Sequence, residues 1–464
     1  MAGIGWRLER LIERDSLGGT LGALLTGVAV TSGPWLLTTM VLVIMRVTAV
    51  GAGSLAAVQG ERVITIVYAI VIVLAAPIDI VLNRFASDRV YESKRDQIAA
   101  PLRRVLAACI VGFTIVGALA MLAADVSREL ALPGAVLAGI VGSQWLLLSA
   151  AGGLSSPGII LKAFGLGAPI SVISSVVLAR PDVLGGVGYL YGYGAGQLVT
   201  LGFLLWGTMR ALPEHEDEDA RILPAFVTYW LLAAAAFAFN AGLWVDKITV
   251  YFLAGGDAAA NYAAGAAVAW LSVVPAFAFL FVAIETTFHR RFFAYYSSLQ
   301  QGASLPALER LAVDVRREVG RTLSGTAAVQ GCVTLLCLAA RPWIERKLAL
   351  GALGDETLMW LLLGAGFQVV AMATTLLLYY FDFRKEAFAT ALIQLAGNGV
   401  FTVLIGAPSA RVGLGYTVAC ALSCAVALVL LRRCMANLLE RTFQSQPYSS
   451  EDFGEDHVAA TTRT

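Results

Sequence analysis

Long apolar stretches separated by short polar connections dominate the sequence. A helix needs about 20 mostly apolar residues to cross a bilayer, and stretches of this kind recur from one end of the chain to the other. Twelve can be marked, covering residues 17–45, 63–83, 105–124, 133–153, 157–179, 183–208, 224–252, 258–284, 322–340, 357–380, 387–407 and 412–431. The pattern predicts an all-α polytopic membrane protein with twelve transmembrane helices.

The composition leads to the same fold class. Of the 464 residues, 58% are hydrophobic and 14% are charged, whereas soluble domains carry about 25% charged residues. The formal net charge is only +1, so the overall charge gives no reason to expect a nucleic-acid partner.

The polar segments divide the chain into five predicted parts. The first residues place apolar and arginine side chains on opposite faces of a helix, which is typical of a helix lying on a membrane surface. The parts are this amphipathic interfacial helix at 1–16, an N-lobe at 17–208, an acidic cytoplasmic linker at 209–223, a C-lobe at 224–443 and a disordered cytoplasmic tail at 444–464.

Two of the spans end alike, which indicates an internal repeat. The second span ends in NRF at residues 83–85 and the eighth is followed by RRF at residues 290–292, with a proline upstream in both, Pro77 and Pro275. Many transporters are built from repeats of this kind. We therefore expect two pseudo-symmetric six-helix lobes around a central cavity.

The basic residues predict how the chain is oriented in the membrane. If the N-terminus is inside the cell, most of the 33 lysines and arginines fall on the cytoplasmic side, with many in segments 84–104 and 290–321. Cytoplasmic loops are enriched in Lys and Arg. Both termini are therefore expected in the cytoplasm, which an even number of spans permits.

Polar and aromatic side chains follow one face of several predicted helices. One interpretation is hydrogen bonding between helices of a tightly packed bundle. The other, which we favour for the stripes together, is a water-filled lumen for a neutral polyhydroxylated substrate, because a phosphate carrier would place several arginines there. The residues expected along this substrate pathway are Trp35, Tyr68, Asn83, Tyr193, Gln197, Asn240, Trp244, Gln368, Gln394 and Asn398.

Five charged residues in or beside the spans are candidates for coupling or gating. Asp79 is the most deeply placed carboxylate, and a charge at mid-membrane costs roughly 2.5–3.5 kcal/mol. It either binds a proton or pairs with a basic residue such as Arg84. Asp246 and Lys247 form either a gate or a structural ion pair near the outer interface. The other two candidates, near the inner interface, are Glu285 and Arg291.

The sequence contains no recognisable catalytic or metal-binding motif. The six cysteines have no paired CxxC spacing, and the three histidines are far apart along the chain. The sequence also has no P-loop, so ATP hydrolysis by this chain is not expected. We predict a protein that is not an enzyme, with no catalytic residues, no metal and no cofactor.

Glycines and prolines predict local packing and bends. Gly188, Gly192 and Gly196 recur at every fourth position in the sixth span, a spacing typical of close helix contact. Pro275 is expected to bend the eighth span. Residues 305–323, LPALERLAVDVRREVGRTL, are amphipathic and predict a further helix on the membrane surface.

Several segments together resemble the PelG family of Pel exopolysaccharide transporters. The resemblance is spread over most of the chain, and the tail after about residue 443 lies outside it. The segments are AGIGWRLERLIERDSLGG near the N-terminus, SGPW at 32–35, WVDK at 244–247, VPAFAFLFVAIETTFHRRFFAYY at 274–296 and LLLYYFDFRKEA at 376–387.

This resemblance implies the fold of the multidrug/oligosaccharidyl-lipid/polysaccharide flippase superfamily, with twelve helices in two lobes around a central cavity. It implies a location in the bacterial inner membrane and export of a hexosamine-rich polymer to the biofilm matrix. It also implies partners, namely a cytoplasmic glycosyltransferase and membrane subunits that include a cyclic di-GMP receptor.

Three functions are open at this point. We expect export of a Pel-like exopolysaccharide from cytoplasm to periplasm, within a synthase and export complex. The first alternative is a lipid-linked oligosaccharide flippase, or a drug or ion antiporter of the same superfamily. The second is a membrane scaffold of a synthase complex that transports nothing. The sequence does not determine the sugar, the energy source or the stoichiometry of the complex.

Overall fold

The computed structural model describes Thr38, Val41 and residues 55–154, 157–180, 182–213, 221–347, 356–406 and 411–444. Within these residues the chain is almost entirely helical and contains no strand. Ten helices in the described part of the chain are long and apolar enough to cross a membrane, which makes the protein a multi-pass membrane protein.

Some predicted parts lie outside the described residues. These are the interfacial helix at 1–16, nearly all of the first span at 17–45, residues 214–220 of the acidic linker and the tail after Gln444. Each of the other eleven predicted spans coincides with helical structure.

The described N-lobe consists of five long helices and two short 3₁₀ turns. All five long helices fall on predicted spans. They are α4 (Leu55–Tyr91), α5 (Ala99–Ala123), α6 (Arg128–Leu154), α7 (Pro157–Leu178) and α8 (Gly188–Arg210), with η1 (Arg95–Gln97) before α5 and η2 (Gly185–Val187) before α8.

The C-lobe begins with a short helix and continues as a second bundle. Its elements are α9 (Leu223–Thr228), α10 (Trp230–Ala254), α11 (Gly256–Leu271), α12 (Val274–Ala283), the π-helix η3 (Ile284–Phe288), α13 (His289–Gln300), α14 (Leu305–Lys347), α15 (Thr357–Tyr380), α16 (Arg384–Phe401), the π-helix η5 (Thr402–Gly406), α17 (Leu414–Ala436) and α18 (Leu438–Gln444).

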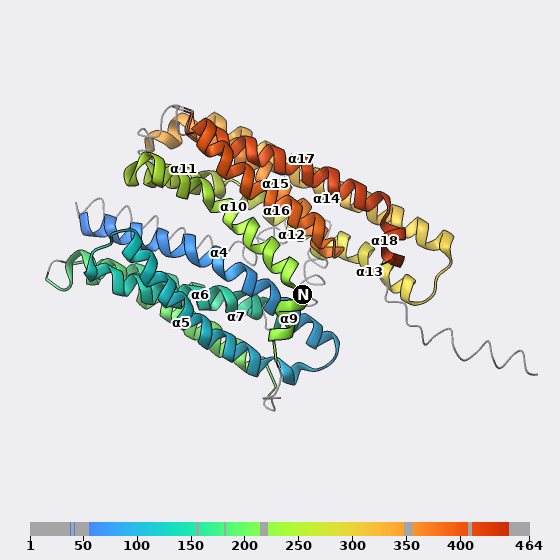
Figure 1. The fold of residues 1–464 in the computed structure, drawn as a ribbon, viewed down its shortest axis with the longest axis horizontal. Helices are drawn as coiled ribbons and strands as arrows, with labels where there is room; N and C mark the ends of the chain where they lie inside the picture. Colours follow the sequence, from blue (N-terminus) through green and yellow to red (C-terminus); the bar gives the residue numbers. More distant parts are fainter. Residues whose placement is uncertain are drawn as a thin grey trace, which may run out of the picture.

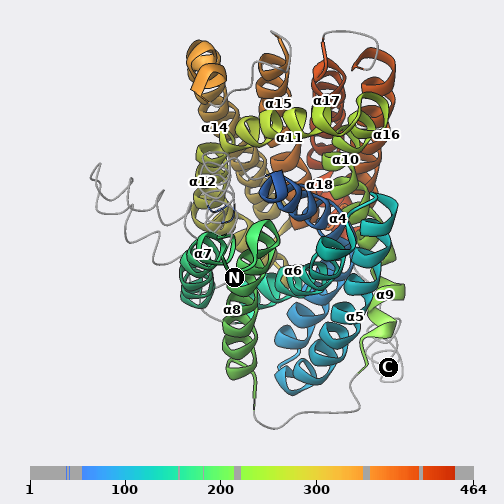
Figure 2. The same cartoon turned by 90° about the vertical axis from the view of Figure 1, so that its left-hand side faces the viewer.

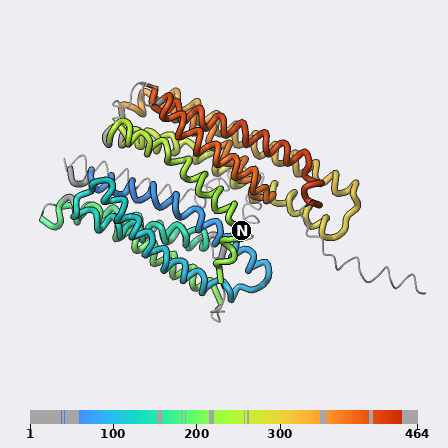
Figure 3. The backbone as a smooth tube through the Cα atoms, in the orientation of Figure 1, coloured from blue at the N-terminus to red at the C-terminus, as the bar shows by residue number. Residues whose placement is uncertain are grey.

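The two groups of helices form separate bundles, each with its own apolar core. In Figure 1 the blue-to-green helices α4–α8 lie below the green-to-red helices α10–α17. The turned view of Figure 2 and the backbone tube of Figure 3 show the same division. One core cluster consists of N-lobe side chains such as Val67 and Leu147, while two others consist of C-lobe side chains such as Leu377 and Val369.

The helices within the two bundles pack in the same order, as a repeat would require. In the N-lobe α6 packs against α5 and α8, and α7 packs along α8. In the C-lobe α15 packs against α14 and α17, and α16 packs along α17. The second set follows the first in chain order, which supports the predicted pseudo-symmetry of the lobes.

Helix α8 coincides with the sixth predicted span but is not among the ten candidate spans, because its glycines and tyrosines make it less apolar. The predicted glycine face contacts α7. A Cβ atom on Gly192 would lie 2.2 Å from the backbone nitrogen of Ser175, and one on Gly196 would lie 2.4 Å from the carbonyl oxygen of Gly167. The glycines therefore let the two backbones approach closely, as their spacing predicted.

The eighth span is interrupted at Ser272 and Val273, directly before the proline that was expected to bend it. Helix α11 ends at Leu271 and α12 starts at Val274, with Pro275 in the first turn of α12, where a missing N–H leaves no hydrogen bond unmade. Pro77, in contrast, lies inside the uninterrupted helix α4.

The prediction of a separate surface helix at 305–323 was wrong. These residues are the first half of α14, which continues without a break through the ninth span to Lys347. No proline separates the amphipathic part from the apolar part that follows, so one ladder of backbone hydrogen bonds continues through both.

Substituting Gly196 by Ala tests the α7–α8 contact. The added methyl group would lie 2.0 Å from Ser171 Oγ and 2.4 Å from the Gly167 carbonyl, so we expect the free energy of unfolding to fall by roughly 1–3 kcal/mol. The control is Gly194→Ala, because nothing lies within 4 Å of a Cβ there. Denaturant unfolding in detergent measures both variants, and equal stabilities would contradict the packing described.

Candidate functional site

The two lobes meet along an antiparallel pair of helices, α4 from the N-lobe and α10 from the C-lobe. Polar contacts join them at both ends. Near the start of α4, the Arg62 guanidinium donates to the hydroxyl of Tyr251 at 2.6 Å, near the end of α10. The end of α4 reaches Tyr229, directly before α10, through Asp88. We call this helix pair the seam.

At the second end of the seam, five side chains form a group that we call the Tyr229 cluster. The Tyr229 hydroxyl donates to Asp88 Oδ2 at 2.5 Å, and Arg84 Nη2 lies 3.3 Å from Asp382 Oδ1. Arg384 binds both Asp382 oxygens at 2.8 Å. The guanidinium groups of Arg84 and Arg384 lie over the Tyr229 ring, with their Cζ atoms 6.0 Å and 5.1 Å from its centroid.

The backbone and the environment fix the roles of two members of the cluster. Asp382 lies in the turn between α15 and α16 with a φ of 56°, a left-handed conformation that Asp adopts more readily than most residues. Burial raises the pKa of Tyr229, and the hydrogen bond and charge of Asp88 raise it further. The phenol therefore keeps its proton at neutral pH and acts as the donor.

The ion pair of the seam is exposed to solvent, so breaking it costs little free energy. The Arg84 and Asp382 side chains are 41% and 47% exposed, and ion pairs of this kind contribute about 1 kcal/mol or less. Contacts of this kind can therefore join the two lobes while the free energy needed to separate the lobes stays small.

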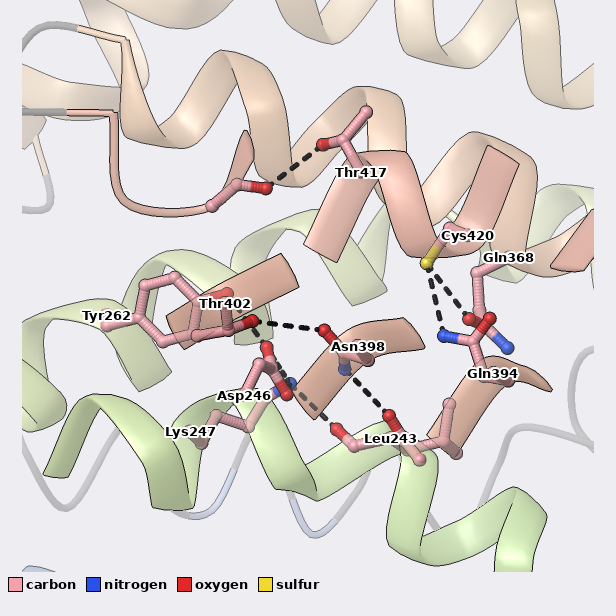
Figure 4. A network of polar contacts seen from close by, with 12 residues as sticks. Leu243, Asp246, Lys247, Tyr262, Gln368, Gln394, Asn398, Thr402, Thr417 and Cys420 are labelled. Atoms are coloured by element: carbon pink, nitrogen blue, oxygen red, sulfur yellow. Dashed lines mark hydrogen bonds and ion pairs between the residues drawn. The ribbon is translucent and has the colours of Figure 1, made fainter. Parts of the chain in front are cut away.

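A buried polar network connects the helices inside the C-lobe (Figure 4). Asp246 on α10 has no solvent exposure, and both its oxygens lie 3.1 Å from Lys247 Nζ. Tyr262 on α11 donates to the same carboxylate at 2.8 Å, and Lys247 Nζ also donates to the Leu243 carbonyl at 2.8 Å. Because this pair is buried and held within one lobe, it is costly to separate.

The same network continues through the predicted pathway residues of the C-lobe. The Asn398 amide donates to the Gly242 carbonyl at 2.8 Å, joining α16 to α10. The Cys420 thiol donates to Gln368 Oε1 at 3.1 Å, and Gln394 Nε2 donates to the Cys420 sulfur at 3.4 Å. Figure 4 shows these side chains turned toward one another between α10, α15, α16 and α17. All of these contacts stay within the C-lobe.

The N-lobe pathway residues also contact their own lobe. The hydroxyl groups of Tyr68 on α4 and Tyr193 on α8 lie 2.8 Å apart, and Tyr193 is fully buried. Gln197, one turn further along α8, is buried, and its Oε1 has no hydrogen-bond partner among the described residues. Asn83 donates to Ser149 Oγ on α6 at 3.1 Å, and the Ser149 hydroxyl also contacts Asp79.

The remaining predicted site residues do not join these groups. Asn240 donates to the Ala236 carbonyl of its own helix at 2.9 Å, and Trp244 is half-buried on α10. Glu285 is half-buried in the π-helix η3, while Arg291 is exposed and lies 3.7 Å from Asp314 on α14. Trp35 lies outside the described residues.

The sequence did not predict most of the seam contacts. It gave Arg84 as one alternative partner for Asp79, whereas the Arg84 contact that joins the lobes is the ion pair with Asp382. Tyr262 and Cys420 were also not predicted. Their only sequence signal is a position at the end of an apolar run or within one, which does not identify a partner on another helix.

This arrangement is suited to movement of two rigid bodies against each other. Several polar side chains of each lobe make buried interhelical contacts, such as Tyr68 with Tyr193 and Tyr262 with Asp246. Among the described residues, the polar contacts between the lobes are more exposed and lie at the two ends of one helix pair. Breaking either end of the seam therefore disturbs little of the interior of a lobe.

The sequence profile of the PelG family, described as "Putative exopolysaccharide Exporter (EPS-E)", matches residues 1–443. That range includes both lobes and the seam. No curated protein matches the chain.

Several solved transporter structures share the fold at low sequence identity. An inward-facing multidrug resistance MATE family transporter of the MOP superfamily aligns with a TM-score of 0.64 and 12% identity, over 86% of this chain and 95% of the other. An outward-facing MATE transporter aligns with a TM-score of 0.62 and 14% identity, over 91% and 96%.

A third similar structure is a MOP superfamily transporter from Pyrococcus furiosus Vc1, described as having a binding pocket of reversed polarity that suggests a different function. It aligns with a TM-score of 0.64 and 12% identity, over 90% of this chain and 96% of the other. At these identities the three structures establish the fold alone.

Removing one partner of the buried ion pair tests whether it is structural. Asp246→Asn leaves the Lys247 ammonium without its counter-charge, so we expect the free energy of unfolding to fall by roughly 3–5 kcal/mol. Asp182→Asn is the control, because the Arg180–Asp182 pair is 63% exposed on both sides and should contribute about 1 kcal/mol or less. A variant as stable as the wild type that loses transport would instead support the gating interpretation.

Proposed function

Because this chain belongs to the PelG family of exopolysaccharide exporters, we propose that it carries a neutral, hexosamine-rich polysaccharide from the cytoplasm to the periplasm across the bacterial inner membrane. The observation that carries this proposal is the seam, where two rigid lobes meet through separate contacts at the two ends of one helix pair. A passage between the lobes can open at one end while the other end stays closed.

The orientation follows from the basic residues. With both termini in the cytoplasm, the end of α4 with the Tyr229 cluster faces the cytoplasm, and the Arg62–Tyr251 contact faces the periplasm. The basic side chains in the last turn of α4 and directly after it, such as Arg89 and Lys94, then lie on the cytoplasmic side, as expected near a cytoplasmic loop.

Transport requires the seam contacts to break and re-form in turn. Separation of Tyr229 from Asp88, and of Arg84 from Asp382, opens the cytoplasmic end to the polymer. Separation of Arg62 from Tyr251 opens the periplasmic end. The exposure of these side chains keeps the cost of each step low.

The chemistry of the lobes suits a neutral sugar polymer. Amides, hydroxyls and aromatic rings exchange hydrogen bonds with sugar hydroxyls and cover the apolar faces of the rings, without fixed charges that would select a phosphate. We retain Tyr68, Tyr193, Gln394 and Asn398 as candidates for contact with the polymer when the lobes separate. The chain itself catalyses no covalent step in this proposal.

The partners follow from the family. The polymer is supplied by a cytoplasmic glycosyltransferase, and membrane subunits that include a cyclic di-GMP receptor complete the complex. The cytoplasmic end of the C-lobe, where α13 meets the long helix α14, extends past the seam and offers a surface for such a partner (Figure 1).

Reconstitution with the synthase tests the proposal directly. Proteoliposomes that contain the chain and its glycosyltransferase are supplied with radiolabelled nucleotide sugar, and an added glycoside hydrolase then digests any polymer left outside. We expect label to survive in the lumen only when the transporter is present. Complete digestion in the presence of transporter would leave a scaffold role, while protection of short lipid-extractable products would indicate a flippase.

Crosslinking each end of the seam tests the alternating movement. Cysteines introduced at positions 88 and 229, or at 62 and 251, are joined by a short bifunctional thiol reagent after reconstitution. We expect either crosslink to reduce polymer protection to background, because each end must open once per cycle. Single-cysteine variants treated with the same reagent are the controls, and export that continues with either end crosslinked would show that the seam does not open there.

A further inference from the structure

Helix α4 carries polar groups on two opposite faces near its cytoplasmic end. Arg84 and Asp88 follow Asp79 by five and nine residues, which turns them by roughly 140° and 180° around the helix axis. They point to the C-lobe and form part of the Tyr229 cluster. Asp79 faces the opposite way, into the N-lobe, where its neighbours come from α5 and α6.

A small cavity lies against Asp79 inside the N-lobe. It has room for about one water molecule. Apart from Asp79 and Asn83, all of its walls are apolar. The lining residues are Asp79, Leu82, Asn83, Phe85, Ala86, Ile98, Leu102 and Ala150.

The carboxyl group of Asp79 is only partly satisfied. Its Oδ1 atom is buried and has no hydrogen-bond partner in the part of the chain that the structure describes, while the hydroxyl of Ser149 on α6 hydrogen-bonds the carboxyl group. Ser149 in turn accepts the Asn83 amide at 3.1 Å. One carboxyl oxygen therefore lacks a partner among the described residues, in a side chain that lines the cavity.

The charged groups around this site point elsewhere. On α4 itself, Arg84 pairs with Asp382 and Asp88 accepts the Tyr229 hydroxyl, both across the seam. On α5, Arg103 and Arg104 follow Leu102 but are exposed. The cavity walls contributed by α5 and α6 contain no titratable side chain. Among the described residues no cation partners the buried Oδ1 of Asp79, and a buried charge without such a partner is costly, whereas the protonated acid is not.

We propose that Asp79 is a proton-binding site of the N-lobe, held by Ser149 and Asn83, and that its proton is exchanged when α4 moves at the seam. A metal ion fits the site poorly, because hard cations take about six oxygen ligands and the cavity offers one carboxyl and one amide. A proton needs only one oxygen, and Asp79 Oδ1 is available for it.

Helix α4 links proton binding to the seam because it carries both. Loss of the proton leaves a charge inside the N-lobe that is relieved only if α4 shifts to bring Asp79 toward water or toward a cation. Any shift of α4 also displaces Arg84 and Asp88 from their partners in the C-lobe. This coupling rests on the proposed transport function, whereas the binding of the proton does not.

Infrared difference spectroscopy of the full chain in lipid bilayers tests the binding site without any polymer. We expect the wild type to show a protonated carboxyl band that disappears on alkalinisation, and Asp79→Asn to lack it. Glu285→Gln is the matched control, since it removes another half-buried carboxyl of a span and should keep the band. A band that persists in Asp79→Asn would overturn the proposal.

Two further measurements keep this test decisive. Ser149→Ala retains the carboxyl and should move the midpoint of the titration, so the site can be assessed even if Asp79→Asn folds poorly. Replacing K⁺ by Na⁺ at constant pH should leave the band unchanged. Loss of the band on adding Na⁺ would assign the site to a metal ion instead and overturn the proposal.

The coupling is tested by distance measurements across the seam. Spin labels at Ser87→Cys on α4 and Leu223→Cys on α9, in a background without native cysteines, report the separation by electron paramagnetic resonance. We expect the wild-type distances to change between acidic and alkaline pH, and those of Asp79→Asn to stay in the acidic distribution. If Asp79→Asn responds like the wild type, the coupling is refuted. Failure of polymer export alone would refute only the transport function.

Discussion

A hydrogen-bonding group inside a bilayer must find its partner within the protein, because lipid chains offer none. Helices meet this requirement for the backbone, and the described chain is accordingly helical almost throughout. Polar side chains meet it by contacting other helices. Asn398 reaches the backbone of α10, Tyr262 reaches Asp246, and Tyr68 reaches Tyr193, each within its own lobe.

The polar contacts inside the lobes therefore differ in burial from those that join the two lobes. Inside the C-lobe, the ion pair Asp246–Lys247 is buried and expensive to break. Across the seam, Arg84–Asp382 is half-exposed, and Arg62 meets Tyr251 at an exposed helix end. Two separately packed bundles joined by weak contacts fit the proposed cycle, in which the two ends of the seam open in turn.

The sequence predicted much of the fold and only part of the site. The close α7–α8 contact through Gly192 and Gly196 and ten of the twelve predicted spans follow from local residue chemistry, and the structure confirms them. The first span lies outside the described residues, and the sixth, α8, is helical but less apolar than the ten. The separate surface helix failed because nothing between residues 305 and 347 ends a helix. Of the predicted pathway residues, Gln368 and Gln394 do come together, but through Cys420, which carries no polar pattern of its own.

The sequence by itself determined which segments cross the membrane and which face of each helix is polar, since apolar length and helical spacing are properties of a single segment. The tertiary structure alone decided which polar faces meet. Arg84 and Asp382 are 298 positions apart and Arg62 and Tyr251 are 189 apart. Periodicity along one helix contains no information about the helix opposite, so these contacts follow only from the packing of the two lobes.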